Sequence, residues 1–195
     1  MGTDIAIKPL SVETLPDFLH FFDNAVFSEH PNWSVCYCYS FHFVGSGAEW
    51  NDKEKNRSAV IELVKTRHMH GYLAYSDRIP VGWCNANDKR SFERLRLNSF
   101  EWIWDDSPGQ TCSVVCFLID PRHRGKGIAS ALLDRACVDY RERGYAAIEA
   151  YPSTKKGSAE DQCNGPLSMY LGNGFQMIRE QDDAVLVRKK LSSED

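Results

Sequence analysis

Several common features are missing from this sequence, and each absence excludes a class of protein. No apolar run approaches the ~20 residues that a membrane-spanning helix needs. Positive charge is not in excess, because the 195 residues carry a net charge of −4. This balance argues against nucleic acid or an anionic membrane as the main partner. The first nine residues show neither the basic start nor the apolar core of a signal peptide. We find no internal repeat and no low-complexity segment.

Cysteine is present in an odd number, seven, and most of these residues fall inside apolar runs. Without a secretion signal, this pattern indicates reduced thiols in a cytoplasmic protein. Cys36 and Cys38 precede His42, but a Cys-x-Cys without a second close pair is poor zinc spacing. We therefore predict no metal. A Cys–His nucleophilic site stays open, although no oxyanion motif accompanies it.

Strand and helix patterns alternate along the whole chain. The patterns predict strands at 5–10, 72–75, 81–84, 112–119, 146–151, 175–179 and 184–188. They predict a first helix that is capped by Ser11 and further helices over 52–69, 127–143 and 167–171. A short helix is predicted over 91–97. Because residues 112–151 read as a βαβ unit, we predict a single α/β domain.

The most informative segment is the glycine-rich turn between the strand 112–119 and the helix 127–143. It reads Asp-Pro-Arg-His-Arg-Gly-Lys-Gly-Ile-Ala over residues 120–129. Free N–H groups and the positive end of a helix dipole meet there, which suits a phosphate group. A Walker A loop is excluded, because position 120 is not glycine and position 127 is not Ser or Thr. The dinucleotide pattern G-x-G-x-x-G fails at Ser130.

The remaining pattern, Arg-x-x-Gly-x-Gly followed by Ile-Ala, resembles the acetyl-CoA signature of the GNAT superfamily of acyl-CoA-dependent N-acyltransferases. Arg122, Gly125 and Gly127 fall on its fixed positions. A second segment, Tyr-Leu-Gly-Asn-Gly-Phe at 170–175, resembles the Tyr-x-x-x-Gly-Phe end of that fold. The resemblance implies one acetyltransferase domain over 1–195 with its cofactor-binding core at about 112–176. It also implies a mixed, mostly antiparallel sheet flanked by helices.

The same resemblance implies which residues hold acetyl-CoA. Main-chain groups of a strand can hold the extended pantetheine arm, and one of their N–H groups can stabilise the developing oxyanion. Where the family often carries an asparagine, this chain has Cys163, and Asn164 is the nearest substitute. The expected cofactor-binding residues are Phe117, Leu118, Ile119, Arg122, Arg124, Gly125, Lys126, Gly127, Ile128, Ala129 and Asn164.

The implied reaction is direct attack of an amine on the thioester, with no covalent enzyme intermediate. Tyr170 matches the family's general acid, and a phenol with a pKa of about 10 can protonate a thiolate with a pKa near ~8.5. The alternative is a core aromatic. No carboxylate lies on the strand 112–119, where many family members carry one. Glu149 is the base we name, while Glu101, Asp105 and a water chain stay open.

Aromatic residues are concentrated between Trp33 and Trp50. These aromatic residues either pack in the core or line a pocket for the acceptor. The second role is possible because cationic amines can contact aromatic faces. We name Trp33 and Tyr37 as substrate-binding residues. The sequence thus predicts a cytoplasmic N-acetyltransferase acting on a primary amine of a small molecule or a peptide. The alternative is a CoA-binding regulatory or sensor module without turnover. A homodimer stays open, and neither nucleic acid nor a membrane is an expected partner.

Overall fold

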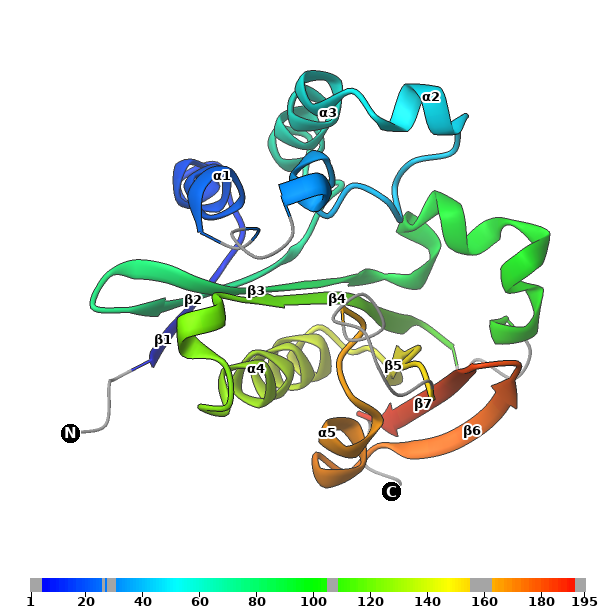
Figure 1. Cartoon of the computed structure of the whole chain (residues 1–195). Helices are drawn as coiled ribbons and strands as arrows, with labels where there is room; N and C mark the ends of the chain where they lie inside the picture. Colours follow the sequence, from blue (N-terminus) through cyan, green and yellow to red (C-terminus); the bar gives the residue numbers. More distant parts are fainter. Residues whose placement is uncertain (1–4, 26, 28–30, 105–108, 155–162, 192–195) are drawn as a thin grey trace.

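The computed structural model describes residues 5–25, 27, 31–104, 109–154 and 163–191. Seven strands form one sheet in the order β1-β2-β3-β4-β5-β7-β6 (Figure 1). They are β1 (Ile5–Pro9), β2 (Gly71–Ser76), β3 (Ile79–Asp88), β4 (Thr111–Ile119), β5 (Ala147–Ala150), β6 (Gln176–Gln181) and β7 (Ala184–Lys190). Neighbouring strands are antiparallel except for the parallel pair β4 and β5. This confirms the α/β class and the mostly antiparallel sheet.

Helices cover both faces of the sheet (Figure 1). On one face lie α1 (Leu15–Asn24), α2 (Gly47–Trp50) and α3 (Lys53–Lys65), and on the other lie α4 (Ile128–Glu142) and α5 (Leu167–Gly172). Short 3₁₀ helices are η1 (Pro31–Val35), η2 (Lys89–Ser91), η3 (Glu93–Arg96), η4 (Asn98–Ile103) and η5 (Pro121–His123). Among the described helices, none has the length and apolarity needed to cross a membrane.

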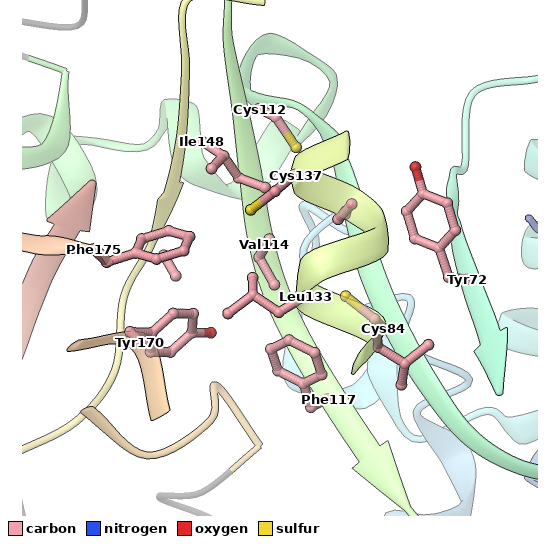
Figure 2. Packing of buried hydrophobic residues seen from close by; sticks show 14 of the residues in the cluster. Tyr72, Cys84, Cys112, Val114, Phe117, Leu133, Cys137, Ile148, Tyr170 and Phe175 are labelled. Atoms are coloured by element: carbon pink, nitrogen blue, oxygen red, sulfur yellow. The ribbon is translucent and has the colours of Figure 1, made fainter. Parts of the chain in front are cut away.

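The buried apolar residues form three clusters, one for each group of helices. Figure 2 shows the cluster on the α4 face, where Leu133 of α4 lies beside Val114 and Phe117 of β4. A second cluster joins α1 and α3 to the opposite face of β2, β3 and β4. The third lies under η2–η4 and includes Phe92 and Leu95. The sheet therefore separates two main cores that are built from different helices.

Several predicted elements are confirmed with small shifts in their ends. The β2–β3 hairpin turns at Asp77 and Arg78, whose φ angles of 50° and 68° correspond to the primed turn that matches strand twist. Gly127, with φ 77°, is the N-cap of α4. The helix predicted at 52–69 already ends at Lys65, and Arg67 has left-handed backbone with φ 59°.

Two helix predictions were wrong in detail. The segment 91–97 forms successive 3₁₀ turns, not a short α-helix. The first helix begins at Leu15, four residues after Ser11. Ser11 and Thr14 instead exchange hydrogen bonds in the turn before the helix, at 2.9 and 3.4 Å. Pro16 then falls in the first turn, where its missing N–H has no helical acceptor.

The feature that positions the site is the point where β4 and β5 part. Their pairing ends at Val114 and Ala150, while β4 continues to Ile119 along β3. Just there, Asn85 pairs with Cys116 and Ala86 with Val114, so that Val115 is an extra residue and β4 is bulged. The second half of β4 is therefore paired with β3 along one edge. Along its other edge the pairing with β5 has ended.

Candidate functional site

A cavity of about 330 Å³ opens beside the diverging half of β4. Segments far apart in the sequence contribute to its wall, namely the end of β4, the turn into α4, the chain before α5, and the region after α1. The residues in its wall are Phe27, Trp33, Phe117, Leu118, Ile119, His123, Arg124, Gly125, Gly127, Ile128, Ala129, Ser130, Cys163, Gly165, Pro166 and Met169. Eight of the predicted cofactor-binding residues and the predicted Trp33 are among them.

The turn from β4 into α4 is held by Asp120, which is buried. Its Oδ1 accepts hydrogen bonds from the main-chain N and the Nε of Arg122 at 2.9 and 3.1 Å, and its Oδ2 accepts one from Nη2 at 2.7 Å. These bonds lower the pKa of the Asp120 carboxyl and raise that of Arg122. Arg122 is thus engaged in shaping the turn, and its side chain is not part of the described cavity wall.

Two glycines give the turn its form. Gly125 and Gly127 have φ angles of 72° and 77°, a conformation that L side chains adopt only with strain. A Cβ built on either residue would meet no protein atom within 4 Å, because both positions face open space. The first hydrogen bond of α4 runs from the N–H of Ala131 to the carbonyl of Gly127. The N–H groups before Ala131 therefore have no helical acceptor and are available to an anion.

The open edge of β4 offers fewer main-chain groups than expected. The N–H of Phe117 donates to the carbonyl of Cys163 at 2.5 Å, while the N–H of Asp120 donates to Val81 of β3. Because main-chain groups alternate along a strand, Leu118 shares the direction of Asp120 and Ile119 that of Phe117. The main chain of Ile119 therefore faces the open edge together with that of Phe117, whereas Leu118 belongs to the cavity wall with its main chain directed toward β3.

Tyr170 and Asn164 lie behind the cavity wall. Tyr170 is fully buried, and its hydroxyl donates to the carbonyl of Asn164 at 2.6 Å. Burial raises the pKa of this phenol well above its usual value. The Asn164 amide donates to the carbonyl of Tyr151 at 3.2 Å, so Cys163 rather than Asn164 faces the cavity. A Cβ on wall residue Gly165 would lie 3.2 Å from the Tyr170 hydroxyl, which places this hydroxyl directly behind the wall.

Glu149 does not suit the role of base that the sequence suggested. It is completely buried on β5, and its two oxygens accept from Lys89 and from Arg188, each at 2.7 Å. The carboxylate is thus fully committed to a buried ion pair away from the cavity wall. Glu101 is exposed on η4, and Asp105 lies outside the described residues.

The two predicted substrate-binding aromatics occupy different places. Trp33 of η1 lines the cavity. Tyr37 is fully buried, its ring stacks on Phe22 with centroids 5.8 Å apart, and its hydroxyl donates to Asp23. Tyr37 therefore packs the core between the loop and α1, which is the alternative that sequence left open.

Some wall residues were not predicted. Ser130 stands where the dinucleotide pattern has its third glycine, and Cys163 where the family often has asparagine, so sequence held a signal for both. No motif or spacing in the sequence marks Phe27 or Met169 as residues of this wall. Within the described part of the wall the charged or titratable side chains are His123, Arg124 and Cys163, with no carboxylate. Among described residues, no three His, Cys, Asp or Glu side chains are arranged to hold a metal ion.

Comparison with known protein families gives one match. The sequence profile of the Acetyltransferase (GNAT) family matches residues 31–157, which is well over half of the chain. No protein with a curated description matches the sequence.

Solved structures with the same fold are numerous but distant in sequence. An N-acetyltransferase from Staphylococcus aureus Mu50 is 16% identical, with a TM-score of 0.58 over 97% of this chain and 99% of that one. The PaiA N-acetyltransferase from Thermoplasma acidophilum in complex with coenzyme A is 16% identical, with a TM-score of 0.58 over 96% and 99%. The ribosomal-protein-S18-alanine N-acetyltransferase from Escherichia coli is 13% identical, with a TM-score of 0.55 over 98% and 97%.

Proposed function

The chain belongs to the GNAT acetyltransferase family and is an acyltransferase, and we propose that it transfers the acetyl group of acetyl-CoA to a primary amine of a small molecule or a peptide by direct attack. The observation that carries the proposal is the cavity in which the open edge of β4 meets the glycine turn of α4. Acetyl-CoA supplies an activated acyl group as a thioester, and the residues of this chain bind and orient it.

The glycine turn fits the phosphate groups of the cofactor. Gly125 and Gly127 leave open space where side chains would otherwise stand, and α4 points its first N–H groups at that space. Arg124 lines the same end of the cavity, and Lys126 is exposed between the two glycines. Their positive charges suit a pyrophosphate in a chain that is acidic as a whole.

The strand edge and the loop before α5 fit the pantetheine arm. Ile119 presents its main chain to the open edge, where an amide of the arm can extend the sheet. Phe117 has its N–H on the same edge, where it donates to the carbonyl of Cys163. Either N–H is a fixed donor of the kind that stabilises negative charge on a reacting carbonyl oxygen.

Tyr170 is our candidate for the proton donor to the leaving thiolate. Its hydroxyl lies behind Gly165, so it has to exchange the carbonyl of Asn164 for the sulfur during the reaction. Catalytic hydrogen bonds are often misaligned before the substrate binds. For the acceptor we propose contact with Trp33, and we assign no base, because no carboxylate belongs to the described wall.

The test is release of free CoA thiol from acetyl-CoA against a panel of polyamines, aminoglycosides, amino acids and peptides. We expect at least one amine to accelerate thiol release and its N-acetylated product to appear by mass spectrometry. A calorimetric titration is run beside it. Absence of acetyl-CoA binding at high micromolar concentration would falsify the proposal at its first step, whatever the acceptor.

A further inference from the structure

The sheet divides the seven cysteines, all within the described ranges, into two groups. Three belong to the cluster on the α4 face drawn in Figure 2, namely Cys84, Cys112 and Cys137. Four belong to or pack against the cluster on the opposite face, namely Cys36, Cys38, Cys116 and Cys163. The second group brings together three distant chain segments, just where β4 and β5 part. No disulfide joins any of the seven.

Cys38 lies in a strained turn whose shape fixes its sulfur. The N–H of Tyr39 donates to the carbonyl of Cys36 at 2.7 Å, and the two residues between them have φ angles of 41° and 54°. This is a primed turn built without glycine, so both residues carry the strain of left-handed backbone. Asn85 of β3 holds the turn, because its amide lies 3.3 Å from both the carbonyl oxygen and the Sγ of Cys38.

Cys116 belongs to the same buried cluster as Cys38. It pairs with Asn85 in the β3–β4 register, beside the bulge, so its side chain lies on the same face of the sheet as the Asn85 amide that reaches the Cys38 sulfur. Burial opposes ionisation of Cys38, but hydrogen bonding, to which the Asn85 amide contributes, outweighs it and lowers the pKa of Cys38. The neighbouring Cys38 and burial raise the pKa of Cys116. Cys38 is therefore the sulfur of the two that ionises more readily.

The two cysteines lie in chain segments that continue into the cavity wall. Cys116 directly precedes wall residue Phe117, whose N–H binds the carbonyl of wall residue Cys163. On the other side, the N–H of Cys36 donates to the carbonyl of wall residue Trp33 at 2.9 Å. Both cysteines are thus joined to wall residues through the main chain, and a bond between the sulfurs would tie the turn that supports Trp33 to β4.

We propose that Cys38 and Cys116 form a redox modification site, in which hydrogen peroxide closes a reversible disulfide beside the cavity. The Cys38 thiolate attacks one peroxide oxygen, an S–O bond forms, the O–O bond breaks, and the departing hydroxide takes up a proton as water. The sulfur of Cys116 then attacks the sulfenic sulfur, the S–S bond forms, and the hydroxide leaves as water with the thiol proton. Two electrons pass from the two sulfurs to one peroxide.

The test uses the reduced, folded chain, a small excess of hydrogen peroxide and N-ethylmaleimide to block the remaining thiols. We expect an intact mass lower by two hydrogens before blocking, two fewer maleimide adducts after it, reversal by dithiothreitol, and a cross-linked peptide pair containing Cys38 and Cys116. A map that shows no disulfide, or one that pairs other cysteines, overturns the proposal. No acetyl-CoA is present, so this result is independent of the proposed function.

Single substitutions then assign the two roles. Cys116→Ala should leave Cys38 as a sulfenic acid that dimedone traps, whereas Cys38→Ala should leave Cys116 reduced. Cys112→Ala, in the group on the other face of the sheet, is the matched control and should leave the disulfide unchanged. Dimedone trapping at Cys116 in the Cys38→Ala chain would contradict the order of attack. If an alanine variant does not fold, the peptide map of the unmutated chain still shows whether the disulfide between Cys38 and Cys116 forms.

Discussion

At the scale of single residues, Gly127 and Gly144 form a matched pair at the two ends of α4. Their φ angles are 77° and 80°, and a Cβ on either meets no atom within 4 Å. Gly127→Ala and Gly144→Ala should therefore each destabilise the fold by about 1–2 kcal/mol, measured by urea unfolding. Only Gly127→Ala should also weaken acetyl-CoA binding, about tenfold or more, because its methyl group enters the cavity. Equal calorimetric affinities for the two variants would show that the phosphates bind elsewhere.

Tyr140 is a matched control for substitution of Tyr170. Both are fully buried, and Tyr140 donates to the carbonyl of Ala86 at 2.9 Å as Tyr170 does to Asn164. Each Tyr→Phe substitution should reduce the free energy of unfolding by about 1–3 kcal/mol, since a buried carbonyl loses its donor. If Tyr170 is the acid, only Tyr170→Phe lowers kcat, by about 10²-fold or more, with little change in acetyl-CoA affinity. A kcat above half of the unmutated value, with chemistry rate-limiting, would leave Tyr170 a structural role.

At the scale of elements, one buried carboxylate joins η2, β5 and β7. Glu149 accepts from Lys89 and Arg188, and Lys89 also donates to the carbonyl of Ile103. Glu149→Gln leaves two buried cations without their anion and should cost about 3–5 kcal/mol in urea unfolding. The control Glu62→Gln breaks an exposed pair with Lys65 and should change stability little. Below the melting temperature, kcat of Glu149→Gln should stay within a few fold of the unmutated chain, and a loss of 10²-fold would restore Glu149 as the base.

The turn between β4 and α4 should show its dependence on Asp120 in the acid range. The pKa of Asp120 is lowered by its bonds to Arg122, so the folded state favours the carboxylate. This contribution is complete above the ordinary aspartate pKa of about 3.9 and is lost as the pH falls through the lower folded value. The stability gap between the unmutated chain and Asp120→Asn, measured by urea unfolding from pH 6 to pH 2, should therefore narrow below about pH 4. A constant gap would contradict the role of the charge.

The elements that sequence predicted best were those with a local cause. The hairpin at Asp77 and Arg78 and the helix between Gly127 and Gly144 follow from turn residues and apolar periodicity alone. Less predictable was the segment 89–103, because its 3₁₀ turns depend on tertiary anchors such as the buried Lys89. The glycine turn was likewise visible from its motif, whereas the hydrogen bond between Phe117 and Cys163 joins residues that no spacing rule connects. The ion pairs of Glu149 with Lys89 and Arg188 could not be predicted, because no spacing in the sequence connects these three residues.

At the scale of the whole molecule, acetyl-CoA should stabilise parts of the chain that are distant in sequence. Its cavity combines the β4–α4 turn with residues 163–169 and with Trp33. At a concentration of 100 times Kd the ligand should add about 2.7 kcal/mol, or roughly 5–10 °C in Tm for a chain of this size. Hydrogen exchange should slow in these three segments, whereas the edge strands β1 and β6 should change little. Protection spread evenly over the sheet would contradict this binding site.

The hydrogen bond between Phe117 and the carbonyl of Cys163 also bears on how fast a cofactor can enter. Under the proposed function, a pantetheine amide that uses this N–H must displace an acceptor that belongs to the same chain. Such an internal competitor is always present at the same effective concentration, however dilute the protein is. Association should then level off at high acetyl-CoA, at the rate at which residues 163–166 release the strand. The ligand-free chain keeps this N–H satisfied, so its own loop must release the strand before a cofactor can bind there.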